Sequence, residues 1–191
     1  MAHDPFNAII APRPIGWIAS QDNAGQVNLA PYSFFNAFNY VPPIIGFASV
    51  GYKDSVRNIE QTGEFCWNLV SEPLMEKMNQ TSASVEQDVD EFDVGKLKKT
   101  PSRCVAVPHV AESPVIMECK KTQIVRLKDK AQQEVDTWMV FGEVVAVHIN
   151  KAMIEDGVYQ TVAGQPVLRG GGTGDYFTID ESGKRIMPRP G

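Results

Sequence analysis

Lys53, Asp54 and Ser55 stand where a turn of small residues leads into a predicted helix, and together they could hold a phosphate. Lys53 offers a mobile positive charge and Ser55 a hydroxyl. Ser49 supplies a second hydroxyl, and Gly51 has no side chain to block the approach of a ligand. This spacing predicts an anion-binding site over residues 49–55. The alternative is that Asp54 or Ser55 simply caps the helix, which is the usual role of such residues at a helix start.

The helix after this turn is predicted from its apolar spacing. Val56 and Ile59 stand three apart, so one face can be buried while Arg57 and Glu60 stay in water. Gly63 is a suitable C-terminal stop. The first amides of a helix have no internal partner and carry the positive end of its dipole, so they favour an anion at the same place.

The composition indicates a single domain over residues 1–191. At 191 residues and 43% apolar, the chain is long enough for one well-buried domain and short for two. Its 18 Lys and Arg residues against 23 Asp and Glu residues give a net charge of −5 without a basic stripe, so no nucleic-acid partner is expected. No apolar run approaches a membrane span, and the N-terminus lacks a basic region followed by an apolar stretch. These features predict a cytoplasmic protein without a membrane partner.

The cysteines and histidines do not form a metal-binding pattern. The three cysteines are widely spaced among apolar residues, which predicts buried free thiols rather than disulfides or ligands; they are Cys66, Cys104 and Cys119. The three histidines are scattered along the chain; they are His3, His109 and His148. A zinc site would have to be assembled from distant segments, so none is predicted.

Apolar, β-favouring runs alternate with turn residues along most of the chain. The predicted strands span residues 14–20, 27–35, 44–50, 65–70, 114–127 and 134–150. The polar segment 21–26 joins the first two as a hairpin, and 128–133 joins the last two as a long hairpin. Many strands with hairpin connections favour an antiparallel barrel over alternating βαβ units.

The remaining segments are predicted to lie around this barrel. Residues 71–84 carry helix signals, and the acidic segment 84–99 is interpreted as a short helix or a surface loop. Asn150 is predicted to cap a short helix over 151–156. The glycine-rich tail over 166–177 is predicted to be irregular, with a loose terminus after it. No Gly-x-Gly-x-x-Gly turn follows the first strand, so a dinucleotide fold is not expected.

Several motifs occur in an order that is more specific than any one of them. They are Pro12-Arg13-Pro14-Ile15-Gly16-Trp17, Asn28-Leu29-Ala30-Pro31-Tyr32-Ser33-Phe34-Phe35-Asn36, Lys53-Asp54-Ser55-x-Arg57-Asn58, Glu112-Ser113-Pro114, Phe141-Gly142-Glu143 and Arg169-Gly170-Gly171. Over nearly the whole chain this set closely resembles the flavin reductase-like, FMN-binding split-barrel family, which includes flavoredoxin. The resemblance implies a mainly β fold, a six-stranded antiparallel Greek-key split barrel with a few short peripheral helices. It also implies a homodimer with FMN bound at or near the subunit interface.

The resemblance also implies which residues contact FMN. The stretch from Ala30 to Asn36 would lie along the flavin ring, and residues 49–55 would hold the phosphate, which is the site suspected from the helix start. The expected cofactor residues are Asn28, Ala30, Pro31, Tyr32, Ser33, Phe34, Asn36, Ser49, Lys53, Asp54, Ser55, Arg13, Arg169 and Tyr176. Trp17, Tyr32 and Phe34 could cover the ring faces, or they could pack in the core.

Four further residues have two interpretations each. Arg13 would contact the phosphate or a second subunit, or form an ordinary surface ion pair. Arg169 and Tyr176 would close over the site, or belong to a flexible glycine-rich loop. His148 would assist a nicotinamide, as a late histidine does in short-form flavin reductases, or would be a hydrogen-bonded structural residue.

The function implied by the resemblance is that of an FMN-dependent oxidoreductase. A hydride would pass from NAD(P)H to N5 of FMN, and electrons would then pass to a flavin, a redox partner protein or another small acceptor. Because the flavin carries this chemistry, no catalytic side chain is predicted. The alternatives are an FMN-holding electron carrier without a nicotinamide site, and a non-catalytic split barrel that binds flavin or haem.

Overall fold

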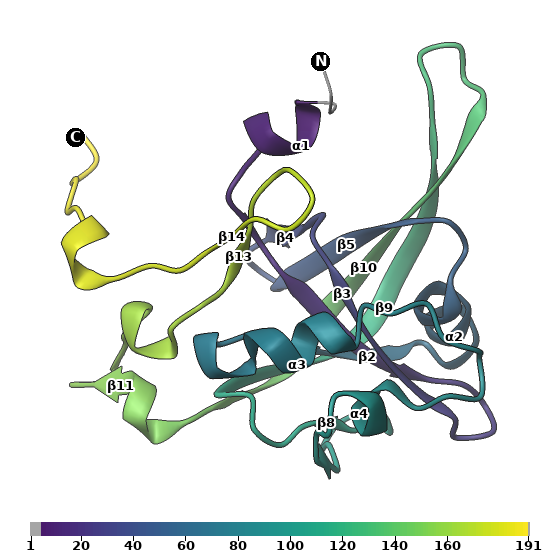
Figure 1. The fold of residues 1–191 in the computed structure, drawn as a ribbon, viewed down its shortest axis with the longest axis horizontal. Helices are drawn as coiled ribbons and strands as arrows, with labels where there is room; N and C mark the ends of the chain where they lie inside the picture. Colours follow the sequence, from purple (N-terminus) through teal and green to yellow (C-terminus); the bar gives the residue numbers. More distant parts are fainter. Residues whose placement is uncertain (1–4, 191) are drawn as a thin grey trace.

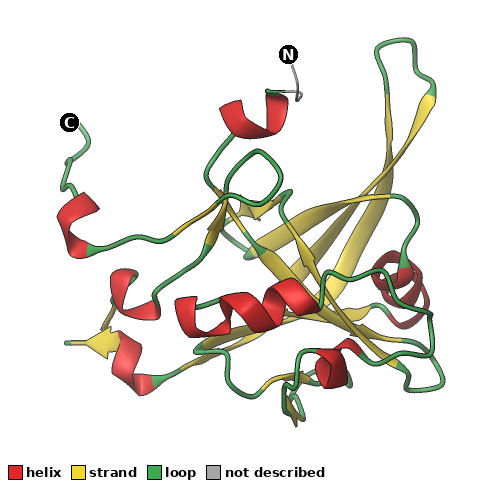
Figure 2. Cartoon of the chain, viewed as in Figure 1, coloured by secondary structure: helices red, strands yellow, loops and turns green. Residues whose placement is uncertain are grey.

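The computed structural model describes residues 5–190, and its centre is an antiparallel sheet of seven strands (Figure 1). The strands are β2 (Gly16–Gln21), β3 (Val27–Tyr32), β4 (Phe35–Asn39), β5 (Ile44–Val50), β6 (Glu64–Asn68), β9 (Val115–Lys128) and β10 (Glu134–Ile149). Their order across the sheet is β3-β2-β6-β9-β10-β5-β4. Short helices surround the strands (Figure 2), so the predicted mainly β class with few helices is confirmed.

The sheet is curled because its two edge strands are neighbours in sequence. β3 and β4 lie at opposite ends of the strand order, yet only Ser33 and Phe34 separate them. At this bend the chain leaves β2 and pairs with β5, and Ala48 N donates to Phe34 O at 2.8 Å. The prediction of one strand over 27–35 was therefore wrong, and the sheet has seven strands where six were expected. The Greek-key order stays a prediction.

Both predicted hairpins of the main sheet are present. In the β2–β3 turn, Asp22 Oδ1 accepts hydrogen bonds from the amides of Ala24 and Gln26, both at 2.9 Å. In the β9–β10 turn, Asp129 Oδ1 accepts from Ala131 N at 2.8 Å and from Gln133 N at 2.9 Å. Aspartate stabilises a turn in this way by replacing a backbone acceptor. The tip of the β9–β10 hairpin extends beyond the rest of the sheet (Figure 1).

The predicted helix after Lys53 is α2 (Asp54–Thr62), and Gly63 ends it in the left-handed region at φ 75°. The predicted helix over 71–84 is shorter, because a 3₁₀ turn (Glu72–Leu74) precedes α3 (Met75–Gln80) and the chain turns after Gln80. The acidic segment contains the short helix α4 (Glu91–Val94) within a loop, as expected. Another short helix, α1 (Phe6–Ile9), precedes the first strand.

Two predictions for the C-terminal third were wrong. After Asn150, whose side chain accepts from Ala152 N as predicted, a 3₁₀ turn (Lys151–Met153) leads into a hairpin of β11 (Ile154–Glu155) and β12 (Val158–Tyr159). Asp156 and Gly157 both have positive φ, which is the geometry of a type I′ hairpin turn and ends any helix there.

The tail is also more regular than expected. β13 (Leu168–Arg169) pairs with β1 (Arg13–Pro14) and with β14 (Tyr176–Phe177) in a small sheet. Two 3₁₀ turns, Val162–Gly164 and Glu181–Gly183, flank that sheet in the chain, and β7 (Lys99–Thr100) pairs with β8 (His109–Val110) elsewhere. The tail is therefore fastened to the N-terminal segment.

The core has two parts, because successive residues of a strand point to opposite faces. Trp17 and Ala19 of β2 lie in one cluster with side chains from α3 and α4, whereas Ile18 lies in the other with Val56 and Ile59 of α2. In the residues described, no helix combines the length and apolar content needed to cross a membrane.

The cysteines follow the same division of the core. Cys66 and Cys119 are buried in different clusters, and burial raises the pKa of the Cys66 thiol to about 12. Cys104 is exposed, so the prediction that all three thiols are buried was wrong for that residue. Its position in a surface loop, rather than its sequence neighbours, decides its exposure.

Candidate functional site

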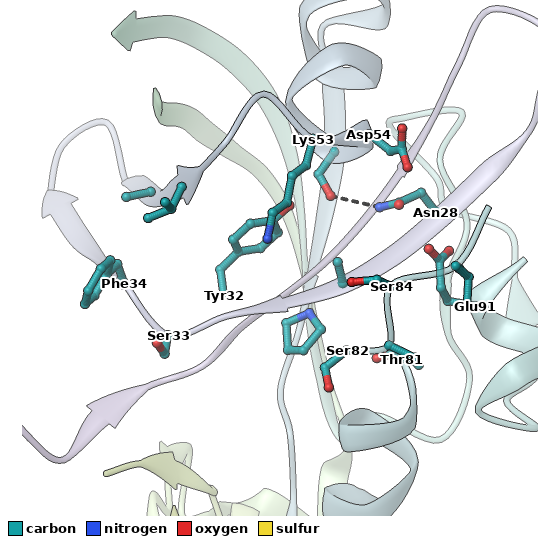
Figure 3. Close-up of a pocket in the computed structure, with 17 residues that line it drawn as sticks. Asn28, Tyr32, Ser33, Phe34, Lys53, Asp54, Thr81, Ser82, Ser84 and Glu91 are labelled. Atoms are coloured by element: carbon teal, nitrogen blue, oxygen red, sulfur yellow. Dashed lines mark hydrogen bonds between the residues drawn. The ribbon is translucent and has the colours of Figure 1, made fainter. Parts of the chain in front are cut away.

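A cleft of about 440 Å³ lies between β3, the start of α2 and the segment 81–85 (Figure 3). A volume of this size is within the range of small-molecule and cofactor sites. Many predicted cofactor residues line it, namely Asn28, Ala30, Pro31, Tyr32, Ser33, Phe34, Lys53, Asp54 and Ser55. The tertiary structure therefore brings the 28–34 stretch and the helix start together around one space.

One end of the cleft suits an anion. Lys53 is the N-cap residue of α2, with extended backbone at φ −90° and ψ 173°, and its side chain is exposed at the cleft. Asp54 and Ser55 lie inside the first turn, so neither is the N-cap residue, contrary to the alternative interpretation. The amides of this turn have no intrahelical partners and add a positive potential. Asp54 is the carboxylate of this turn, and it forms an ion pair with Arg57.

The floor of the cleft is a buried set of hydroxyl and amide groups. Asn28 Nδ2 lies 2.8 Å from Ser55 Oγ, as the dashed line in Figure 3 shows. The Tyr32 hydroxyl is hydrogen-bonded to the side chains of Ser55 and Ser49. Burial is the main cause that raises the pKa of Tyr32, so its hydroxyl stays neutral and can donate a hydrogen bond.

Ser49 and Asn36 do not line this cleft. Ser49 is buried, and its Oγ donates to Gly51 O at 2.7 Å, so it holds the turn before Lys53. Asn36 lines a neighbouring cavity of about 560 Å³ under the N-terminal segment, together with Arg13 and Phe34.

Arg13 is buried at the bend between β3 and β4, where its side chain connects this bend to the N-terminal segment and the tail by hydrogen bonds. Its guanidinium donates to the carbonyl oxygens of Ser33 at 3.1 Å, Gly170 at 3.1 Å and Asn7 at 2.5 Å, and also to that of Ile10. The guanidinium carbon lies 5.5 Å from the centre of the Phe34 ring. Burial and the nearby Arg169 lower the pKa of Arg13. The prediction of an ordinary surface ion pair was wrong, because the side chain is 9% exposed and bonded to backbone carbonyls.

Arg169 and Tyr176 line a recess of about 280 Å³ that shares Pro31, Ser33 and Ser82 with the cleft. Arg169 Nη1 donates to Gly171 O at 3.0 Å and to Asp175 O at 2.8 Å, and its guanidinium lies 5.0 Å from the Tyr176 ring centre. These contacts hold the glycine-rich loop in place beside the cleft.

Of the aromatic residues expected at the ring faces, only some reach the cleft. Trp17 is fully buried, and its Nε1 donates to Thr81 Oγ1 at 3.0 Å, so core packing was the correct interpretation for this residue. Tyr32 packs 4.5 Å from the Phe47 ring and presents its other side to the cleft. Phe34 is half-buried and lines both the cleft and the neighbouring cavity.

The sequence interpretation missed one whole wall of the cleft. Residues 81–85 and Glu91 line it opposite β3. The signal was present in the small polar run Thr81-Ser82-Ala83-Ser84, which indicates a turn after a helix rather than its continuation. Glu91 gave no such signal, because its side chain reaches the cleft only through the packing of α4 on β3.

His148 lies away from the cleft and is bonded to a buried carboxylate. Its Nε2 is 2.5 Å from Glu118 Oε1, and its ring stacks 5.4 Å from that of His109. This geometry agrees with the structural interpretation of His148. His3 lies outside the described residues, and within those residues no group of three or more His, Cys, Asp or Glu side chains could hold a metal ion.

A family model, "Flavin reductase like domain", matches residues 10–164. The chain belongs to this family. It is 33% identical over 182 residues to an uncharacterized protein of Halalkalibacterium halodurans, covering 90% of this chain and 86% of that protein. The resemblance inferred from the motifs is thus confirmed, and the tail with Arg169 and Tyr176 lies outside the matched residues.

Two solved structures extend the comparison to the fold. Nitrilotriacetate monooxygenase component B of Bacillus cereus has a TM-score of 0.85 at 28% identity, covering 92% of this chain and 88% of that chain. A Shewanella frigidimarina protein described as having a split barrel domain has a TM-score of 0.85 at 26% identity, covering 97% and 90%. The curled sheet is therefore a split barrel of the flavin reductase-like type.

Proposed function

We propose that the protein is an FMN-dependent oxidoreductase of the flavin reductase type, which takes a hydride from NAD(P)H and passes electrons to a flavin, a redox partner protein or another small acceptor. The observation that carries the proposal is the cleft itself. It joins the positive start of α2 to the 30–34 stretch of a chain that belongs to the flavin reductase-like family. When bound, FMN would supply the hydride and electron chemistry at N5.

The residues of this chain would bind and orient the cofactor. Lys53, the first amides of α2 and the Ser55 hydroxyl would hold the phosphate, since these groups combine charge with hydrogen-bond donors. Ser33 and the backbone of Ala30 would meet the polar edge of the ring, and Phe34 would cover part of a face.

The more distant residues would act by support. Arg13 would keep the bend at Ser33 and Phe34 in shape, because its guanidinium is already bonded to carbonyl oxygens. Arg169 and Tyr176 would border the ring end from the adjoining recess. Ser49 and Asn36 would make no direct contact, since both lie outside the cleft lining.

The test is the visible spectrum of the purified protein, followed anaerobically after addition of NADH or NADPH. Bound flavin is expected to give bands at about 375 and 450 nm that bleach with the nicotinamide. A colourless protein that also fails to bind added FMN would contradict the proposal.

A second candidate is an FMN-holding electron carrier without a nicotinamide site. Among the described residues, Lys53 is the one cation that lines the cleft. A nicotinamide dinucleotide carries a pyrophosphate of its own, and if Lys53 holds the FMN phosphate, no second cation of the described cleft lining pairs with that pyrophosphate. Flavin bands that bleach with dithionite and persist with NADH and NADPH would favour this candidate. Haem binding is disfavoured, since no histidine is among the described residues that line the cleft.

We also propose a homodimer. Large apolar side chains are exposed on β4, the turn after it, β5 and β10; they include Tyr40 at 90%, Val41 at 80%, Val50 at 58%, Phe38 at 52% and Val147 at 49%. Exposed apolar surface of this kind marks protein interfaces. Sedimentation at micromolar concentration is expected to give a dimer, and a monomer would contradict the proposal. The cytoplasmic location stays a prediction.

A further inference from the structure

The cleft contains a buried carboxylate where an anion site would favour positive charge. Glu91 is 7% exposed, and its Oε2 accepts a hydrogen bond from Leu29 N at 3.1 Å. Burial, and then the charges of Asp54 and Asp90, raise the pKa of Glu91, and the Leu29 amide partly offsets them. Both aspartates already have a cationic partner, since Asp90 is paired with Lys99 and Asp54 with Arg57. Lys53, which lines the cleft, forms no ion pair among the described residues. Glu91 can therefore gain a proton more readily than an exposed glutamate.

The Asn28 amide joins Glu91 to Ser55. With Nδ2 toward Ser55, the amide donates to Ser55 Oγ at 2.8 Å and Ser55 keeps its own proton. When the amide rotates by half a turn, Nδ2 donates to Glu91 Oε1 at 3.3 Å, and Oδ1 accepts from Ser55 Oγ at 2.8 Å and from Leu29 N at 3.3 Å. A serine hydroxyl has one proton, so the two orientations direct that proton to different acceptors.

The state of Glu91 decides between these orientations. An ionised carboxylate only accepts hydrogen bonds, so it favours Nδ2 toward itself, and Ser55 then donates to Asn28. A protonated carboxyl can donate, so it favours Oδ1 toward itself, and Nδ2 then donates to Ser55. The Ser55 proton is free for a ligand in the cleft only in the second arrangement. The neutral Tyr32 hydroxyl, which is also bonded to Ser55, can act as a donor in either case.

We propose that Glu91 and Asn28 are positioning residues of the anion end of the cleft, which direct the Ser55 hydroxyl either to Asn28 or to the bound anion. The inference rests on the proposed function, in which that anion is the FMN phosphate. An anion favours the arrangement in which Glu91 is protonated, since this frees a donor and removes a negative charge. FMN binding therefore takes up a proton, and affinity rises as the pH falls.

The Glu91→Gln variant tests this directly, because a carboxamide is uncharged and presents a permanent donor to Asn28. At a pH high enough to ionise Glu91 in the wild type, the variant is expected to bind FMN about tenfold more tightly than the wild type, the effect of one charged hydrogen bond. At a pH low enough to protonate Glu91 in the free wild type, the two proteins are expected to bind equally. Titration of the FMN phosphate itself is common to both proteins and cancels in the ratio. Equal affinities across the whole pH range would overturn the inference.

A double-mutant cycle with Ser55→Ala separates two contributions to FMN affinity, that of the Ser55 hydroxyl and that of the Glu91 charge. In the Ser55→Ala background, the gain from Glu91→Gln is expected to fall to the part that comes from charge alone. The same gain in both backgrounds would overturn the relay through Asn28. Riboflavin, which lacks the phosphate, is the ligand control, and its affinity is expected to be unchanged by Glu91→Gln.

Calorimetry on the wild type does not depend on any variant folding. Titration with FMN in buffers of different ionisation enthalpy, at the pH where FMN affinity falls most steeply, is expected to reveal uptake of a proton. A cationic site lowers the pKa of a phosphate, so the phosphate would release a proton rather than take one up. FMN binding without uptake would overturn the relay and leave the proposed function standing. A wild type that binds neither FMN nor riboflavin would overturn both.

Discussion

Among the described residues two glutamates are buried, Glu118 and Glu91, and their surroundings differ. Glu118 is fully buried and accepts hydrogen bonds from the consecutive amides of residues 103–105, at 2.9, 2.6 and 3.2 Å, as well as pairing with His148. Burial by itself would raise the pKa of Glu118, but the amides and His148 outweigh it, so the pKa is lowered. This carboxylate is held in its charged form and organises a surface loop.

Glu91 has fewer donors. The backbone amides of Leu29 and of Glu91 itself donate to it, no histidine of the described residues pairs with it, and Asp54 and Asp90 are the charges that act on it. Its pKa is raised, with burial as the main cause. The comparison shows that burial alone does not determine the direction of a carboxylate's pKa shift. Hydrogen-bond donors and neighbouring charges also contribute, and around Glu118 they outweigh burial. The glutamate with more donors holds a surface loop, and the one with fewer donors lines the cleft.

The largest expected effect is on stability. Glu118→Ala removes three backbone hydrogen bonds to a buried carboxylate, each typically worth about 1.5–3 kcal/mol without full additivity, so it should lower the free energy of unfolding by about 3–5 kcal/mol. Glu91→Ala leaves the buried amide of Leu29 without its acceptor and should cost about 1–3 kcal/mol. Denaturant unfolding of both variants measures the difference. An equal loss of unfolding free energy in the two variants would show that the different numbers of donors do not affect stability.

The next effect is on ligand binding and concerns the cleft alone. The double variant Lys53→Ala with Ser55→Ala should weaken FMN binding by about 2–4 kcal/mol, since charged hydrogen bonds contribute about 1.5–3 kcal/mol each and neighbours do not add fully. Fluorescence titration measures this. Lys120→Ala, which removes an exposed lysine outside the cleft lining, is the charge-matched control. Unchanged FMN affinity in the folded double variant would remove Lys53 and Ser55 from the phosphate site.

The smallest effect is on the pH dependence of stability, and the two glutamates should act with opposite signs. Because the folded pKa of Glu118 is lowered, its contribution is present above its ordinary pKa and lost as the pH falls through the folded value. Because the folded pKa of Glu91 is raised, stability falls as the pH rises from its ordinary pKa through the folded value.

Unfolding measured over a pH series tests these signs. Glu118→Gln should remove the acid-side loss of stability, and Glu91→Gln should remove the decline on the higher-pH side. If either variant keeps the wild-type profile, the assignment of that glutamate is incorrect.

Local patterns in the sequence were sufficient for the elements built from near neighbours. The Asp22 and Asp129 turns and the stop of α2 at Gly63 depend on contacts within a few residues, and all three were predicted. The motif from Asn28 to Phe34 and the cluster from Lys53 to Ser55 were also found, since residue type and order alone carry them.

Other features depended on contacts between distant segments. The break between β3 and β4 arises because the chain exchanges one partner strand for another, and no residue near Ser33 records which strand comes next. Arg13 connects the bend to the tail because both supply carbonyl oxygens around it. Trp17 is buried because side chains of α3 and α4 pack around it, and Thr81 accepts its Nε1–H.

By itself, the sequence determined the family, the hairpins and the residue types at the start of α2, because these follow from local spacing and motif order. Only the tertiary structure placed Glu91 against Leu29, 62 residues away in the chain, and so gave the cleft its buried carboxylate. The physical reason is that the charge of a buried group depends on which donors fold around it, and those donors come from segments that are remote in sequence.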